Sequence, residues 1–202
     1  MPARRTTMLM CGLALYGLSL TLLLRADLGL DPWDVFHQGL ADAIGLSLGT
    51  VIVLTSFAVL ALWIPLRERP GFGTIANALL VGLGVELFSA AIPEIDATGL
   101  RWILLALGIV VNGVATGMYI GAGMGPGPRD GLMTGIARRR GSIRVVRTSI
   151  ELAVLLTGIA LGGTFGIGTL LYAVTIGPLA QVFLPFFAAR ATAEPVLATV
   201  RP

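Results

Sequence analysis

The sequence predicts an all-α, polytopic membrane protein with about six transmembrane helices, arranged as two inverted three-helix repeats. Composition is the first reason: 55% of the 202 residues are hydrophobic and only 12% are charged, whereas soluble domains carry about 25% charged residues. The second reason is that the apolar residues fall in long runs, which must face lipid. The third is that the two halves of the chain share unusual residues in the same order.

The internal repeat aligns residues 12–45 with 108–141, without a gap, and residues 71–88 with 166–183. Apolar helices share Leu and Ala readily, but they rarely share glycine, proline and aspartate in register. The matched pairs of this kind include Gly29 with Gly125, Pro32 with Pro128, and Asp34 with Asp130. Such repeats are typical of membrane proteins whose functional site lies between the two halves.

Six stretches are long and apolar enough to cross about 30 Å of hydrocarbon. They lie near residues 7–24, 46–65, 74–92, 101–120, 146–163 and 168–188. The stretch 146–163 is the least apolar, because Arg147 and Glu151 lie in its first turns. We expect one membrane domain over residues 1–188, with repeat 1 over 7–92 and repeat 2 over 101–188, followed by a short cytoplasmic tail at 189–202.

A short helix is predicted after the first span of each repeat, at residues 32–44 and 128–140. Each begins with a proline, which suits the first helical position, and carries an aspartate that complements the exposed N–H groups there. Each is followed by a glycine, Gly45 or Gly141, which suits the left-handed residue at a helix end. A helix of about thirteen residues rises only about 20 Å, too little to cross a bilayer. Both helices are therefore either interfacial or re-entrant.

The arginines predict the orientation. All basic residues are arginines, and with a cytoplasmic N-terminus and six crossings only Arg25 and Arg101 fall outside. Both termini are then cytoplasmic, and the two short helices face opposite sides. Eight crossings with parallel halves would place Arg67 and Arg69 outside, which disfavours that topology. Because the basic charge is explained by topology, the sequence does not indicate a nucleic-acid partner.

The runs LRADLGLDPWDVFHQGLA, GLSLGTVIVL and GFGTIANALLVG resemble bacterial integral membrane proteins of the YczE/YyaS/YitT type. The resemblance extends from about residue 8 to residue 187. Its most specific part is the Leu-Gly-x-x-Pro-Trp-Asp core at 28–34, supported by the Gly-x-Gly-Thr motif at 71–74. The resemblance implies a multi-pass protein of the cytoplasmic membrane, and it assigns no substrate, cofactor or catalytic residue.

Polar residues in or beside the spans are the candidate substrate-binding residues. They are Asp31, Trp33, Asp34, His37, Asn77, Glu86, Asp130 and Gln181. Gly29, Pro32, Gly125 and Pro128 are expected to shape the two motifs that precede the short helices. In one interpretation the helix N-termini point their partial positive charge at a bound anion or polar substrate. In the other, the aspartates only start amphipathic helices that lie at the two membrane surfaces.

The individual candidates also have alternative interpretations. Trp33 suits the interfacial aromatic belt, and His37 is either a surface histidine or a group in proton coupling. Glu86 and its repeat partner Gln181 could line one polar path, or Glu86 could reach water at the end of its span. Asn77 has a simpler role available, a hydrogen bond between helices.

The sequence contains no catalytic motif, so we expect no enzyme. A single His37 and a single Cys11 build no metal cluster and no intrachain disulfide, and no cofactor is indicated. The first functional hypothesis is a small-solute transporter or exporter with a midplane site between inverted repeats. The alternative is a membrane scaffold or accessory protein that docks a partner. The expected partners are membrane lipids and a small-molecule substrate, and a homodimer is compatible with a unit of this size.

Overall fold

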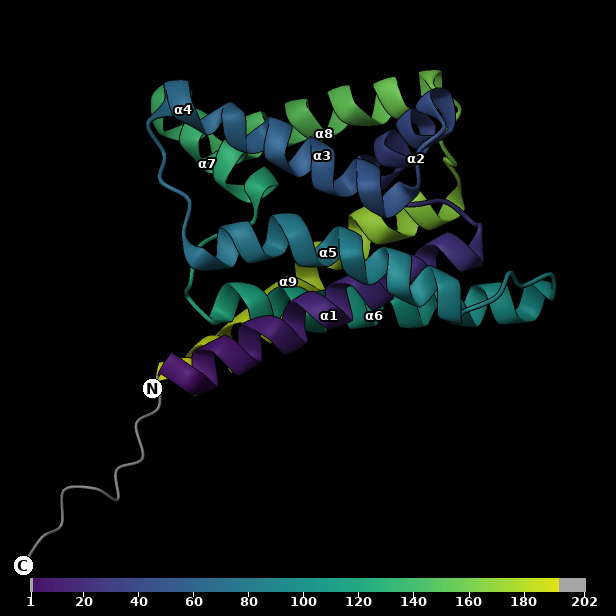
Figure 1. Cartoon of the computed structure of the whole chain (residues 1–202), viewed down its shortest axis with the longest axis horizontal. Coiled ribbons are helices and arrows are strands. Elements are labelled where there is room, and N and C mark those ends of the chain that lie inside the picture. Colours follow the sequence, from purple (N-terminus) through teal and green to yellow (C-terminus); the bar gives the residue numbers. More distant parts are fainter. Residues whose placement is uncertain (1, 193–202) are drawn as a thin grey trace, which may run out of the picture.

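The computed structural model describes residues 2–192, and every regular element in that range is a helix (Figure 1). The helices are α1 (Pro2–Ala26), α2 (Pro32–Ile44), α3 (Leu48–Ala61), α4 (Trp63–Leu66), α5 (Phe72–Ala91), α6 (Thr98–Gly121), α7 (Pro128–Arg140), α8 (Ile143–Ala160) and α9 (Ile167–Thr192). The all-α prediction is confirmed. Of the predicted tail, residues 189–192 continue α9, and residues 193–202 lie outside the described residues.

Five helices are long and apolar enough to cross a membrane. They cover Ala3–Ala26, Leu48–Leu66, Phe72–Ala91, Thr98–Gly121 and Ile167–Ala188. The predicted span 146–163 coincides with α8, which has 18 residues. Because Arg144, Arg147 and Glu151 all lie in α8, this helix is not apolar enough to join the other five by composition alone.

The two short helices begin and end where the sequence predicts. α2 begins at Pro32 and ends before Gly45, which adopts φ 70°. α7 begins at Pro128 and ends before Gly141, at φ 104°. A side chain at either glycine would strain the backbone, so these residues allow the sharp turn into the next helix.

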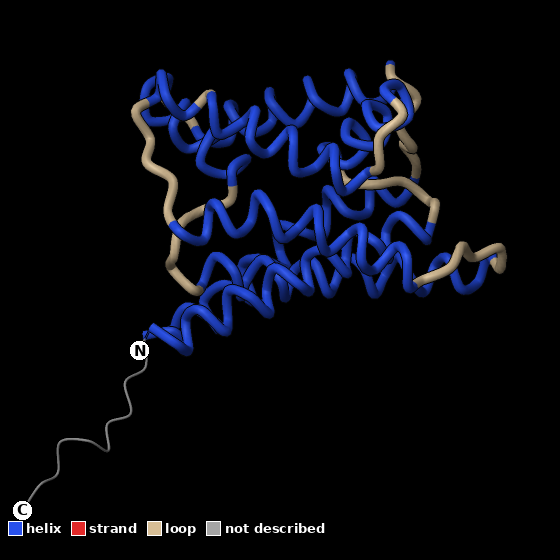
Figure 2. The backbone as a smooth tube through the Cα atoms, in the orientation of Figure 1, coloured by secondary structure: helices blue, strands red, loops and turns tan. Residues whose placement is uncertain are grey.

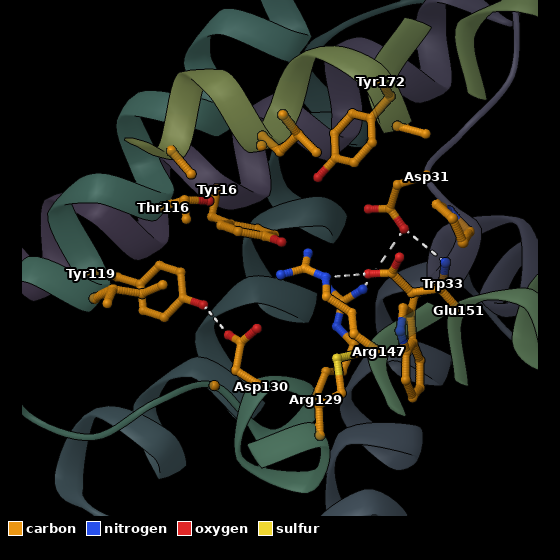
Figure 3. A pocket seen from close by; sticks show the side chains of 18 of the residues that line it. Tyr16, Asp31, Trp33, Thr116, Tyr119, Arg129, Asp130, Arg147, Glu151 and Tyr172 are labelled. Atoms are coloured by element: carbon orange, nitrogen blue, oxygen red, sulfur yellow. Dashed lines mark hydrogen bonds and ion pairs between the residues drawn. The ribbon is translucent and has the colours of Figure 1, made fainter. Parts of the chain in front are cut away.

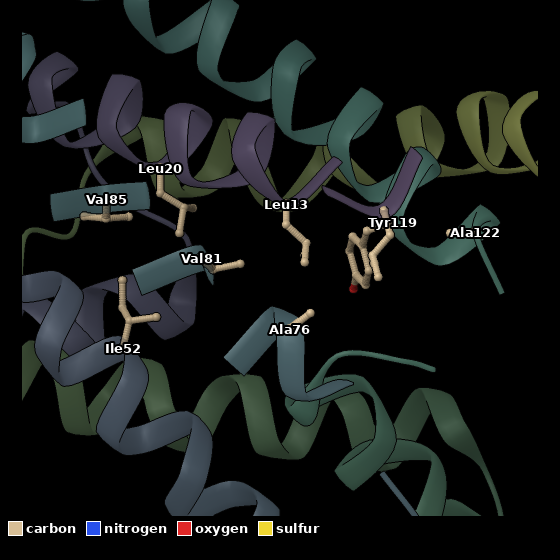
Figure 4. Close-up of a cluster of buried hydrophobic side chains, with 9 residues drawn as sticks. Leu13, Leu20, Ile52, Ala76, Val81, Val85, Tyr119 and Ala122 are labelled. Carbon is tan, nitrogen blue, oxygen red and sulfur yellow. The ribbon is translucent and has the colours of Figure 1, made fainter. Parts of the chain in front are cut away.

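The long helices lie roughly parallel to one another, and the loops gather toward the two ends of the molecule (Figure 2). α1 packs along α5 and α6, and α6 also packs along α9. α3 and α8 lie across the molecule from α1 and α6, while α2 and α7 lie at opposite ends (Figure 1). Leu13, Leu20, Val81 and Val85 form part of a buried apolar cluster that ties α1 to α5 (Figure 4).

Glycines at matching repeat positions bring α1 and α6 together. A Cβ atom on Gly12 of α1 would lie 2.9 Å from the Cβ of Met118. A Cβ atom on Gly108 of α6 would lie 2.9 Å from Cδ2 of Leu23. On each helix the glycine leaves room for the other helix to approach, as small residues commonly do where membrane helices pack closely.

Each repeat also docks a loop onto the other repeat. The Gly73 N–H donates to the Met124 carbonyl oxygen at 2.7 Å, and the Gly168 N–H donates to the Leu28 carbonyl oxygen, also at 2.7 Å. The acceptor loops contain Gly29 and Gly125, which adopt φ 113° and 118°. Such angles favour glycine, which explains why glycine recurs in these loops. In the Gly-x-Gly-Thr motifs glycine is required by close approach, since a Cβ atom on Gly73 would lie 2.9 Å from the Met124 carbonyl oxygen and one on Gly168 would lie 2.7 Å from the Gly29 carbonyl oxygen.

Candidate binding site

Asp31 organises the first turn of α2. Its Oδ1 accepts hydrogen bonds from the backbone N–H groups of Trp33 at 2.8 Å and Asp34 at 2.9 Å, which satisfies two of the free donors at a helix start. One turn further, Asp34 Oδ1 lies 2.9 Å from His37 Nδ1. The three side chains of Asp31, Asp34 and His37 are all buried. The interpretation of His37 as a surface histidine is therefore wrong, and Asp34 lies in the first turn of α2 with its side chain buried.

Burial sets the protonation of this group. It raises the pKa of Asp31 to about 6, and the neighbouring Asp34 carboxylate adds to the rise. Burial also raises the pKa of Asp34. The pKa of His37 falls to about 3, first because of burial and then because of the Arg129 charge. A neutral His37 that carries its proton on Nδ1 donates to the ionised Asp34 carboxylate.

The first turn of α7 carries the second motif but has a different cap. Gly127 stands where α2 has Asp31, and no side chain caps the first N–H groups of α7. Asp130 instead accepts a hydrogen bond from the Tyr119 hydroxyl at 2.5 Å. The Trp63 indole N–H donates to the Pro128 carbonyl oxygen at 3.1 Å and holds the start of the helix against α4.

Arg129 joins the two motifs. Its Nη1 lies 3.8 Å from Asp31 Oδ1, and its Cζ lies 5.4 Å from the centre of the Trp33 ring. Arg129 and Trp33 occupy matching repeat positions, each directly after a motif proline. In the sequence alone, Arg129 is one of the arginines that indicate the topology. Its place between Pro128 and Asp130 was the signal that could have singled it out.

The two first turns line a cavity of about 520 Å³. Its remaining walls come from α1, α5, α6, α8 and α9, and Figure 3 shows how their polar side chains point into it. Those polar residues are Tyr16, Asn77, Thr116, Tyr119, Arg147, Glu151 and Tyr172. Arg147 donates from Nε to Glu151 Oε1 at 2.8 Å, so both an arginine and a carboxylate of α8 face this space. The cavity therefore carries charges of both signs.

A buried polar contact supports the wall of the cavity from behind. The Asn112 amide donates from Nδ2 to the Ser19 hydroxyl at 2.9 Å, and the Tyr172 hydroxyl donates to Asn112 Oδ1 at 3.0 Å. These bonds join α6 to α1 and α9. Asn112 thus has the role of a hydrogen bond between helices.

The structure gathers some of the predicted residues and separates others. Asp31, Trp33, Asn77 and Asp130 line the cavity, and Asp34 and His37 lie beside it in α2. Glu86 lies in a separate groove between α3 and α5, where its Oε1 accepts a hydrogen bond from the Thr50 N–H at 3.2 Å. Gln181 is exposed and lines neither space. Glu86 and Gln181 therefore do not share one polar path in this conformation.

No cluster of three or more His, Cys, Asp and Glu side chains suited to a metal ion occurs among residues 2–192. The cavity instead offers hydrogen-bond donors, carboxylates and aromatic surfaces. This is the chemistry of a site for a small polar organic molecule, because a few polar groups orient the molecule while aromatic walls enclose it.

Comparison with known proteins finds relatives that cover most of the chain. An uncharacterized protein of Haemophilus influenzae is 38% identical over 183 residues, which cover 90% of this chain and 84% of that protein. The uncharacterized membrane protein YczE of Bacillus subtilis is 34% identical over 172 residues, covering 84% of this chain and 80% of YczE. The uncharacterized protein YyaS of Bacillus subtilis is 29% identical over 181 residues, covering 86% of this chain and 89% of YyaS. No solved structure matches.

A family described as being of unknown function, DUF6198, matches residues 3–185. The apolar helices and the similarity to YczE make the chain a membrane protein. The protein therefore belongs to the DUF6198 family, and YczE is among its relatives.

Proposed function

We propose that this protein is a small-solute transporter of the bacterial cytoplasmic membrane, built from two inverted repeats around a central binding cavity. The observation that carries the proposal is the polar cavity of about 520 Å³ between the first turns of α2 and α7. Transporters of inverted-repeat architecture place their substrate at such a junction of short or broken helices. A scaffold that docks a partner has no need of an internal cavity lined by charged side chains.

The reciprocal contacts between the repeats support the inverted arrangement. The Gly73–Met124 and Gly168–Leu28 hydrogen bonds join matching residues of the two repeats in exchanged roles. Two-fold symmetry of this kind lets each half adopt the conformation of the other, which is the basis of alternating access.

The distribution of side chains on α8 supports a sixth crossing. Its apolar residues Val145, Leu152 and Leu156 are exposed on the outside of the molecule. Two of its three charged residues, Arg147 and Glu151, line the cavity and pair with each other, while the third, Arg144, is exposed in the first turn of the helix. A helix that keeps its central charges on the cavity side and its apolar face outward is suited to lipid, because the ionised groups keep polar surroundings.

The two repeats also differ in helix packing, as expected for a transporter whose cavity is open to one side of the membrane. α3 packs along α5 at Gly82, where a Cβ atom would meet the carbonyl oxygen of Gly49. α8 does not pack along α9 in the same way, and Gly177, the repeat partner of Gly82, faces the cavity with nothing within 4 Å of its Cβ position. We propose that α8 closes on α9 at Gly177 in the opposite-facing state, while α3 moves away from α5.

Cysteine accessibility tests alternating access without knowledge of the substrate. Cys11 is the only cysteine, so a Cys11→Ala background allows single cysteines to be placed at Ala180, in the cavity, and at Val174, a 74% exposed residue on the outer face of α9. A membrane-impermeant maleimide should label position 180 from either side of the membrane in oriented vesicles. Position 174 should remain unlabelled from both sides, because lipid covers it.

Labelling of position 180 from one side only, under every condition, would show a static cavity and refute the transport proposal. The direct companion assay is flux of radiolabelled small solutes into proteoliposomes. The same vesicles report orientation: we propose cytoplasmic termini, so a cysteine near the N-terminus should react only from the cytoplasmic side.

A further inference from the structure

We infer that the cavity binds a small zwitterion, an amino-acid-like molecule whose carboxylate lies at Arg129 and whose cationic nitrogen lies at Asp130. This inference rests on the proposed binding cavity and names the class of substrate. It follows from which polar groups of the cavity already have partners and which do not.

Arg129 is the group with unused donors. Among the described residues its guanidinium makes one loose ion pair, 3.8 Å from Asp31 Oδ1, and stacks on Trp33. Asp31 is already bound at the same oxygen by two backbone N–H groups. A guanidinium has five N–H donors arranged to bind a carboxylate in bidentate fashion. Arg129 therefore retains most of its hydrogen-bonding capacity for a ligand inside the cavity.

Trp33 supplies a second, independent sign of a missing acceptor. Its side chain lines the cavity and is 7% exposed, yet its indole Nε1–H has no hydrogen-bond partner in the described part of the chain. Buried indole N–H groups normally find an acceptor. Figure 3 shows the Trp33 ring beside Arg129 and Arg147. A carboxylate bound at Arg129 would place an acceptor in the region that Trp33 faces.

The start of α7 provides further donors. Gly127 takes the place of the capping Asp31 of the other repeat, so the first N–H groups of α7 have no side-chain acceptor. Helix N-termini favour anionic groups, and the Arg129 side chain comes from this same first turn.

The acidic residues explain why the ligand carries a positive charge as well. Asp31, Asp130 and Glu151 line the same cavity as the two arginines, and a plain anion would be repelled by them. Asp130 is bound at Oδ2 by Tyr119, and its Oδ1 has no partner among the described residues. A cationic nitrogen at Asp130 balances the charge. The aromatic and aliphatic walls, Tyr16, Ile176 and Met133 among them, suit the apolar body of the ligand.

The test is equilibrium binding of the proteinogenic L-amino acids to the full chain in lipid nanodiscs, by calorimetry. For each amino acid that binds, the matching acid without the amino group and the matching amine without the carboxylate are titrated as well. We expect at least one amino acid to bind, and both truncated analogues to bind at least about 10-fold more weakly, since each leaves a charged partner unsatisfied.

Variants assign the two ends of the ligand. Arg129→Gln should weaken binding of the amino acid by at least about 10-fold. Arg129→Lys should weaken it less, because Lys keeps the positive charge but cannot bind a carboxylate in bidentate fashion. Asp130→Asn should weaken binding of the amino acid but not that of the deaminated acid, which should bind as tightly or more tightly because one repelling carboxylate is gone. Arg138→Gln is the matched control, since Arg138 lies on the same helix but pairs with Glu68 on the surface. Thermal unfolding of each variant checks that it is folded.

Three results would overturn the inference: no amino acid binding at millimolar concentration, an amine that binds as tightly as its amino acid, or undiminished binding to a folded Arg129→Gln variant. Binding in nanodiscs requires no transport. Binding without flux in proteoliposomes would therefore contradict the proposed function alone. Flux of another solute without amino-acid binding would contradict this inference alone.

Discussion

Gly82 and Gly177 offer a matched pair of substitutions, because they hold the same repeat position in different surroundings. A Cβ atom at Gly82 would meet the carbonyl oxygen of Gly49 and lie 2.6 Å from Val53 Cγ2. Backbone cannot give way as a flexible side chain does, so Gly82→Ala must push α3 from α5, at a cost of about 1–3 kcal/mol in the free energy of unfolding. At Gly177 no atom lies within 4 Å, and alanine in place of glycine within a helix stabilises by about 0.5–1 kcal/mol.

The assay is unfolding of the purified protein in mixed micelles as the denaturing detergent fraction is raised, followed by tryptophan fluorescence. Gly82→Ala should unfold earlier than the parent protein, and Gly177→Ala should unfold at the same point or later. A bulkier Gly177→Leu should remain folded but lose solute flux, because it blocks the proposed closure of α8 on α9. If Gly82→Ala is as stable as the parent, or Gly177→Ala loses as much stability as Gly82→Ala, the assignment of one closed and one open helix pair is refuted.

Three further predictions concern Asp31, Asn112 and Trp63. The raised pKa of Asp31, about 6 against an ordinary 3.8, makes a stabilising contribution that is full below pH 3.8 and lost as the pH rises through 6. Asp31→Asn keeps the helix cap but cannot titrate. Between pH 7 and pH 5, the unfolding temperature of the parent protein should therefore rise relative to that of the variant. Equal shifts in both proteins would contradict this. Asn112→Ala leaves the Tyr172 hydroxyl without its buried acceptor and should lower the free energy of unfolding by about 1–3 kcal/mol in the same detergent titration; no change would mean that water replaces the amide. Trp63→Phe removes the hydrogen bond to Pro128 and should cost about 1 kcal/mol, whereas Trp102→Phe, at a 45% exposed residue, should change stability little; equal effects would show that the bond to Pro128 adds nothing.

The sequence could predict the candidate site only in part. The Pro-x-Asp motifs marked both first turns, so Asp31, Trp33 and Asp130 were expected near a site. Arg129 was overlooked because an arginine close to a membrane surface is more often a topology signal than a ligand. The pairing of Glu86 with Gln181 was expected from the repeat alone, and the structure places them apart because α3 covers Glu86 while Gln181 faces outward.

What the sequence determines by itself is local or compositional. Apolar runs predict helices in a membrane, prolines fix where α2 and α7 begin, and glycines fix where they end, because each of these effects acts within a few residues of the chain. The inverted relation of the repeats follows from the same patterns and stays a prediction until labelling tests it.

Only the tertiary structure decides which distant residues meet. The loop at Gly29 reaches the start of α9 and Arg129 reaches Asp31, because α1 and α6 pack against each other while α5 packs on α1 and α9 packs on α6. The repeat in the sequence likewise does not reveal that α8 and α9 pack less closely than α3 and α5. Both pairs carry a glycine at the matching position, and a glycine is compatible with close packing or with none. Backbone contact joins α3 to α5 at Gly82, whereas Gly177 lines the cavity with no atom within 4 Å of its Cβ position.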